Sequence, residues 1–253
     1  MYAPERQHEI VARARAAGRV DVSTLAAELD VAAETVRRDL TVLERRGLLR
    51  RVHGGAVPVE RLALEPSVPE RDLANPAAKD AIARAALDLL GDARTIVLDG
   101  GTTTARLAAL LPEGRELTVV THALPVAAAL ASLPGITLHL VGGHVRGRTL
   151  VATGPWTTAA LGSLRADVVV LGTNGVSVER GLTTPDLAEA EAKRALAAAG
   201  RRVVVLADRS KLGRDELVTF APLEQVDTLV TDAGADADLV AELAAAGVEV
   251  VTA

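Results

Sequence analysis

The chain has 253 residues, 49% of them hydrophobic, and a formal net charge of −5, which is enough material for two domains with buried cores. It contains no cysteine and only 1% aromatic residues, which excludes a disulfide framework, a thiolate metal site and recognition of single-stranded nucleic acid by base stacking. The charge is uneven, because residues 1–57 hold ten Lys and Arg against eight Asp and Glu and the remainder is acidic. We therefore expect the N-terminal part, and not the rest, to contact duplex DNA.

Residues 1–57 show the pattern of a winged helix-turn-helix. Hydrophobic periodicity favours three helices, a tight turn separates the last two, and a strand with a glycine pair follows. The predicted elements are helices Glu5–Ala17, Ser23–Leu29 and Ala33–Arg46, a turn at Asp30–Ala32, a strand at Leu48–Val52 and a hairpin tip at Gly54–Gly55.

The third helix has two different faces. Val36, Leu40 and Leu43 fall on one face and are predicted to pack inward, whereas the opposite face carries threonines and arginines suited to phosphate oxygens and guanine edges. A charged face that only meets solvent is the alternative, but residues 37–51 contain six arginines and only two acidic residues. The residues predicted to contact DNA are Ser23, Ala33, Glu34, Thr35, Arg37, Arg38, Thr41, Arg45, Arg51 and His53.

Residues 58–76 are predicted to be a linker between domain 1–57 and domain 77–253, since four prolines cannot sustain a long helix there. From Ala77 onward, helical and β-rich segments alternate, which predicts an α/β domain with a parallel sheet. In chain order, the expected segments are helix Ala77–Leu90, strand Thr95–Leu98, helix Thr104–Leu111, strand Leu117–Val120, helix Leu124–Ala131, strand Thr137–Val141, strand Asp167–Leu171, helix Leu187–Ala199, strand Arg202–Leu206, strand Thr228–Thr231, helix Ala237–Ala246 and strand Val248–Val251.

Polar and glycine-rich motifs follow several of these strands. Ligands of parallel sheets bind at the carboxyl ends of strands, so these motifs are expected to line one crevice. In Asp99–Thr104, glycines let the backbone approach an anion, and three hydroxyls and a helix N-terminus supply donors. The alternative interpretation of Asp99–Thr104 is an ordinary strand-to-helix turn without a ligand. The alternative interpretation of Glu189 and Lys193 is a surface ion pair between residues four apart on a helix. The other motifs are Thr121–His122, Gly142–Arg146, Gly172–Gly175 with Gly181–Asp186, and Asp208–Lys211.

The segment VRRDL at Val36–Leu40, followed by LERRGLLRRVHGGAV at Leu43–Val57, resembles the N-terminal signature of the DeoR family of bacterial sugar-metabolism repressors, and the later motifs resemble its effector domain. The resemblance implies a winged helix-turn-helix and a C-terminal α/β domain similar in fold to ribose-5-phosphate isomerase. It also implies a cytoplasmic transcriptional regulator that binds operator DNA as a homo-oligomer, a dimer or a tetramer, without a membrane, and responds to a phosphorylated sugar.

The resemblance also assigns effector-binding residues. By this resemblance, the motif Asp99–Thr104 would bind the phosphate and adjacent sugar hydroxyls, and Asn174 and Asp186 would bind further hydroxyls. Lys193 and Lys211 would complement the negative charge. GTNG followed by GLTTPD is most similar to the fructose branch and suggests fructose 1-phosphate. Two departures from the family are Ala32, where serine is usual, and His122, where asparagine is common. The expected effector residues are Asp99, Gly100, Gly101, Thr102, Thr103, Thr104, Thr121, His122, Gly142, Gly143, Asn174, Asp186, Glu189, Lys193, Asp208 and Lys211.

Two other functions are alternatives to a regulator. A sugar-phosphate isomerase needs a carboxylate base near a sugar C–H, for which Asp99 and Glu189 are the candidates. A dinucleotide-binding redox sensor is disfavoured, because the turn after Leu98 is DGGTTT and not G-x-G-x-x-G. The five histidines show no metal-ligand spacing. We therefore expect no catalytic residue, no metal and no cofactor.

Overall fold

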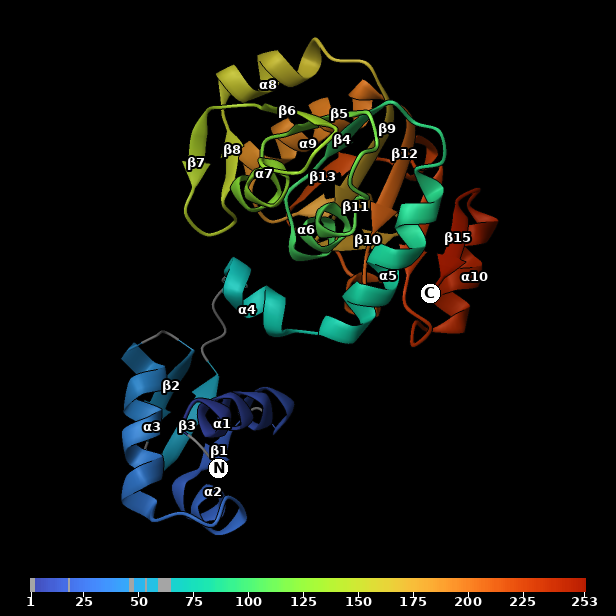
Figure 1. Ribbon diagram of the computed structural model, residues 1–253. Helices are drawn as coiled ribbons and strands as arrows, with labels where there is room; N and C mark the ends of the chain where they lie inside the picture. Colours follow the sequence, from blue (N-terminus) through green and yellow to red (C-terminus); the bar gives the residue numbers. More distant parts are fainter. Residues whose placement is uncertain (1–2, 18, 46–47, 53, 59–64) are drawn as a thin grey trace. The chain divides into compact units, whose positions relative to one another are not determined.

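The computed structural model describes residues 3–17, 19–45, 48–52, 54–58 and 65–253, and the chain divides into two compact units, Met1–Leu64 and Glu65–Ala253 (Figure 1). The second unit thus begins inside the stretch expected to be a linker, ahead of Ala77. The physical reason is local: Glu65 is buried against that unit, and a six-residue helix, α4 (Val68–Leu73), follows it.

The N-terminal unit is a winged helix-turn-helix, as expected. Val36, Leu40 and Leu43 of its third helix are each at most 1% exposed and join one apolar core. The wing is the hairpin of strands Leu49–Val52 and Gly55–Pro58. It packs closely at Gly55, where an added Cβ would lie 2.0 Å from the Val20 carbonyl oxygen. Its helices are α1 (Ala3–Ala17), α2 (Val22–Glu28) and α3 (Ala33–Arg45), and its antiparallel sheet has the order β1 (Val20–Asp21), β3 (Gly55–Pro58), β2 (Leu49–Val52).

The C-terminal unit is built on a seven-stranded sheet, and every strand pair in it is parallel, which confirms the expected α/β class. From edge to edge, the strands are β15 (Glu249–Thr252), β14 (Thr228–Thr231), β12 (Gly200–Leu206), β9 (Ala166–Gly172), β4 (Thr95–Leu98), β5 (Leu117–Thr121) and β6 (Ile136–Leu140).

Helices cover both faces of this sheet (Figure 1). Because side chains alternate along a strand, Val168 and Val170 of β9 enter the core on one face, and Val169 and Leu171 enter the core on the other. The first face packs against α5 (Pro76–Leu89), α6 (Thr102–Ala109) and α7 (Leu124–Leu130), and the second against α8 (Pro155–Gly162), α9 (Leu187–Ala199) and α10 (Ala237–Ala245).

The strand order reverses once within the sheet. β5 and β6 follow β4 on one side, whereas β9 and the later strands extend from the other side of β4. Parallel sheets bind ligands beyond the carboxyl ends of the strands at such a reversal. A ligand site is therefore expected beyond the carboxyl ends of the neighbouring strands β4 and β9.

Short elements outside the main sheet were not expected from the sequence. Strands of three or four residues carry too little hydrophobic periodicity to stand out from loops. They form a ribbon of β7 (His144–Arg146) with β8 (Val151–Thr153), and an antiparallel sheet of β10 (Gly175–Ser177), β11 (Gly181–Thr184) and β13 (Val218–Ala221).

Candidate functional site

The solvent face of α3 carries two exposed arginines, Arg37 and Arg38. Arg37 pairs with Glu34 one turn earlier at 3.1 Å, an exposed contact that competes little with another partner. The Arg38 guanidinium makes no hydrogen bond or ion pair with any residue that the structure describes. It is therefore available for a phosphate or a base edge.

The opposite side of α3 is anchored by a buried carboxylate. Asp39, 4% exposed, accepts hydrogen bonds from Arg6 Nε at 2.6 Å and Gln7 Nε2 at 2.8 Å, both on α1. The sequence suggested Asp39 only as a countercharge to the arginines. Its contacts instead fix α3 against α1, which holds the arginine face in a defined orientation.

The wing meets α3 through Arg51, which donates to the Thr41 hydroxyl at 3.3 Å, while its own backbone N–H donates to Glu44 at 3.0 Å. Ser23 is exposed in the first turn of α2. The remaining predicted DNA contacts, Ala33, Glu34 and Thr35, lie in the first turn of α3. His53 and the side chain of Arg45 lie outside the described residues.

Asp99 is the centre of the polar site at the strand reversal. It follows β4, is 1% exposed, and accepts backbone hydrogen bonds from Gly100 at 2.7 Å and from Gly172, at the end of β9, at 2.9 Å. A side chain at Gly100 would displace Val151, because an added Cβ would lie 2.1 Å from Val151 Cγ1. The ends of β4 and β9 are thus joined through one carboxylate.

His122, placed by the end of β5, is the second neighbour of Asp99. Its Nε2 lies 3.0 Å from Asp99 Oδ1 and its Nδ1 lies 2.7 Å from the Ala152 carbonyl oxygen. Thr121, beside it, uses its hydroxyl to donate to the Leu98 carbonyl oxygen at 2.7 Å, so it ties β5 to β4.

Lys193, on α9, completes the set around Asp99. Its ammonium donates to Asp99 Oδ2 and, at 3.0 Å, to the Gly172 carbonyl oxygen, and it lies 5.2 Å from the centre of the Phe220 ring. Burial would raise the pKa of Asp99, but the charge of Lys193 and the hydrogen bond from His122 hold this pKa below its ordinary value of 3.8. The site therefore contains a stable carboxylate.

The first turn of α6 presents the donors that the sequence predicted. Gly101, at φ 145°, precedes the helix, and no side chain caps it. Thr104 donates its hydroxyl to the Gly101 carbonyl oxygen at 2.9 Å, whereas the hydroxyls of Thr102 and Thr103 have no hydrogen-bond partner among the described residues. Two hydroxyls and the backbone N–H groups of the first turn are thus open to an anion.

Beyond β12, Lys211 is a partly buried cation, and no described residue pairs with its ammonium. Burial lowers its pKa from the ordinary 10.5, and the neighbouring positive charges of Arg214 and Arg71 contribute. Asp208 accepts a hydrogen bond from Asn75 Nδ2 at 3.0 Å, which links the strand end to α5. Asn174 is partly exposed, and its side-chain oxygen accepts from the Thr184 hydroxyl at 3.1 Å.

Asp186 and Glu189 lie at the start of α9, and Glu189 is one turn before Lys193. Asp186 caps the helix, because its carboxylate accepts from the Glu189 backbone N–H at 2.9 Å. Arg146 contacts both carboxylates, at 3.1 Å for Asp186, and Thr149 donates to Glu189. The sequence placed Arg146 in a motif but not among the effector residues. Its distance from Glu189 in the chain left no signal for this pairing.

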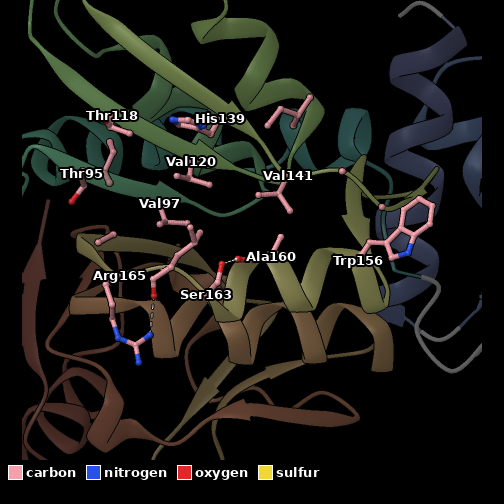
Figure 2. Close-up of a pocket in the computed structure, with 16 residues that line it drawn as sticks. Thr95, Val97, Thr118, Val120, His139, Val141, Trp156, Ala160, Ser163 and Arg165 are labelled. Carbon is pink, nitrogen blue, oxygen red and sulfur yellow. Dashed lines mark hydrogen bonds between the residues drawn. The ribbon is translucent and has the colours of Figure 1, made fainter.

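Gly142 and Gly143 lie elsewhere. They line an open groove of about 780 Å³ between α8 and the sheet face formed by β4, β5 and β6. Figure 2 shows Val97, Val120 and Val141 pointing into this groove toward Ala160, with Trp156 at its rim. Its lining is mostly apolar, which fits a phosphorylated sugar poorly.

Within the described ranges, no three His, Asp or Glu side chains gather into a group that could hold a metal ion. None of the helices described there combines the length and hydrophobicity needed to span a bilayer.

Comparisons with known proteins agree on both units. Residues 6–61 match the DeoR-like helix-turn-helix domain, and residues 74–233 match the DeoR C terminal sensor domain. The HTH-type transcriptional regulator GlpR of Haloferax volcanii is 38% identical, over 99% of this chain and 98% of that protein. The HTH-type transcriptional regulator FruR of Bacillus subtilis is 36% identical, over 92% of each chain. Ribose 5-phosphate isomerase A of Methanocaldococcus jannaschii has a TM-score of 0.38, with 16% identity over 55% of each chain.

Proposed function

The chain belongs to the DeoR family of DNA-binding transcriptional regulators, and we propose that it represses sugar-metabolism genes in response to a phosphorylated sugar. Operator DNA is read by α3 and the wing, and the sugar binds at the strand reversal of the C-terminal unit. A homo-oligomer brings two copies of α3 to the two halves of an operator. An isomerase is disfavoured, because both carboxylates named as candidate bases are already engaged by cations, Asp99 by Lys193 and Glu189 by Arg146.

One observation carries the effector proposal. The open donors of the site, which are the Thr102 and Thr103 hydroxyls and the Lys211 ammonium, belong to segments that follow β4 and β12, the strands on either side of β9. These groups favour an anion, and Asp99 and Asn174 offer oxygens for sugar hydroxyls. A phosphate ester of a sugar has both kinds of group, and fructose 1-phosphate is the first candidate.

Isothermal titration tests the proposal. Fructose 1-phosphate and other phosphosugars are titrated into the protein with and without operator DNA, beside their unphosphorylated parents. We expect a phosphosugar to bind more tightly than its parent and to change operator affinity by about 1–3 kcal/mol, with operator changing sugar affinity by the same factor.

Variants then locate the site. Thr103→Val and Lys211→Met are expected to weaken phosphosugar binding, whereas Arg201→Met, which removes a charge whose side chain is 79% exposed, is the matched control. Equal binding by all three variants and the wild type would place the phosphate elsewhere. Binding without any change in operator affinity would leave a sugar-phosphate binder with no regulatory role.

A further inference from the structure

Glu65 is the first described residue of the C-terminal unit, and its side chain is 4% exposed. Its carboxylate Oε2 accepts a hydrogen bond from Arg146 at 3.0 Å, and its carbonyl oxygen accepts one from Arg148. The next residues continue this attachment, because the Val68 backbone N–H donates to the Arg148 carbonyl oxygen at 3.2 Å. The start of the unit is thus held to the β7–β8 ribbon, to Arg146 of β7 and to Arg148 between the two strands.

The Glu65 carboxylate is held poorly for a group so buried. Its Oε1 has no hydrogen-bond partner, and the Arg71 guanidinium lies 3.8 Å from that oxygen. Arg146 must also serve Asp186 and Glu189, so three carboxylates share one guanidinium. Burial raises the pKa of Glu65 from its ordinary 4.5, and the negative charge of Glu189 raises it further. The ionised form of Glu65 is therefore less stable than that of an exposed glutamate.

The cluster of Arg146 with Glu65, Asp186 and Glu189, together with the segment that follows Glu65, adjoins the proposed effector site on two sides. Glu189 lies one helical turn before Lys193, whose ammonium contacts Asp99. On the other side, Asp72 of α4 pairs with Arg106 of α6, the helix that presents Thr102 and Thr103. The segment from Glu65 to Leu73 therefore lies along the edge of the site, between α6 and the start of α9.

We propose that Glu65 is a built-in anion that occupies Arg146 in the free protein, and that the phosphate of the effector, bound by Thr102, Thr103 and Lys211, also reaches Arg146 and displaces Glu65. The proposal rests on the effector function proposed above. A phosphate dianion offers Arg146 more charge and more acceptor oxygens than one carboxylate. Displacement of the Glu65 side chain removes its contact with Arg146, which is one of the attachments that hold the start of the C-terminal unit.

The test compares Glu65→Gln with Glu191→Gln, which removes an exposed charge from α9. Fructose 1-phosphate and inorganic phosphate are titrated into each full-length protein. Because Glu65→Gln removes the competing charge, we expect it to bind the phosphate probes about tenfold or more tightly than the wild type, whereas Glu191→Gln is unchanged. Glu65→Asp, which keeps the charge but shortens its reach, should lie between them, and it serves if Glu65→Gln does not fold.

Hydrogen exchange in the wild type supplies a readout that a purely structural role would not move. Saturating fructose 1-phosphate should speed amide exchange in residues 65–73 of the wild type, whereas a Glu65 that only stabilises the fold would leave this exchange unchanged by the ligand. Equal phosphosugar affinity in the wild type and Glu65→Gln, with no exchange change, overturns the role of Glu65 and leaves the effector function standing. If Glu65→Gln binds inorganic phosphate more tightly than the wild type but no variant binds a phosphosugar, the role of Glu65 as a competing anion is supported and the phosphosugar effector is rejected. No phosphate binding by any variant rejects both.

Discussion

Lys193 and Asp99 form an ion pair at the reversal of strand order, although they lie 94 positions apart in the chain, and their side chains are only 6% and 1% exposed. The pair joins α9 to the end of β4. Because Asp99 also accepts from Gly172, one buried carboxylate connects the two strands between which a ligand is expected to sit.

Asp99→Asn should destabilise the C-terminal unit. It removes one member of a buried pair and leaves the Lys193 ammonium without a countercharge, which costs about 3–5 kcal/mol. Urea unfolding followed by circular dichroism measures the loss, with Asp92→Asn, an exposed change in the same unit, as the control. A loss no larger than that of the control would mean that the pair contributes nothing to stability.

The contribution of Asp99 should also depend on pH. The folded state holds the pKa of Asp99 below 3.8, so the folded state binds fewer protons than the unfolded state as the pH falls toward that value. The resulting stabilisation is fully present above 3.8 and is lost as the pH falls through the folded-state pKa. We therefore expect the difference in unfolding free energy between the wild type and Asp99→Asn to be constant at higher pH and to narrow in acid. A difference that widens in acid would contradict this sign.

Arg38→Ala should impair operator recognition without unfolding the chain, since the exposed guanidinium has no partner among the described residues. Loss of a bidentate guanine contact costs about 1–3 kcal/mol and lowers the preference for operator over random DNA. Loss of a phosphate contact weakens binding to both DNAs alike. Fluorescence anisotropy with both DNAs separates these outcomes, and Arg201→Ala is the control. Unchanged binding to both would remove Arg38 from the interface.

Ala32→Ser should strengthen the start of α3. The Ala32 carbonyl oxygen accepts from the backbone N–H groups of Thr35 and Val36, at 2.9 and 3.3 Å, so residue 32 occupies the cap position. A serine hydroxyl there satisfies an open N–H group and adds about 1 kcal/mol of stability. Thermal unfolding compares it with Ala27→Ser, an exposed alanine inside α2. If Ala32→Ser is no more stable than the wild type, a serine cap at the start of α3 contributes nothing to the stability of the protein.

The sequence predicted best where the signal was local. The spacing of Val36, Leu40 and Leu43 defined the buried face of α3, and the position of Asp99 directly after a strand placed it at the edge of the sheet where the strand order reverses. Lys193 was expected to offer its charge to a phosphate, but its ammonium contacts Asp99, and no local pattern shows which of two anions a lysine meets.

Other contacts also depend on residues far apart in the chain. Glu65 carried no signal, because Arg146, its partner, lies 81 positions away and the proline-rich composition around it favoured a linker. Gly142 and Gly143 follow β6, and β6 lies at the edge of the sheet, two strands from the reversal. Strand order is a long-range property, so the rule that ligands bind at strand ends could not tell which ends meet.

Trp156 is the only tryptophan of the chain, and it lies 83% exposed at the rim of the apolar groove. The protein therefore carries its own optical reporter. Anything that covers the groove, including a second copy of the chain, moves the indole from water into an apolar environment and shifts its emission to shorter wavelength. Binding at Asp99 and Lys211, whose residues do not line the groove, leaves that emission where it was. Covering of the groove and occupation of the sugar site are thus separable in a single unlabelled sample.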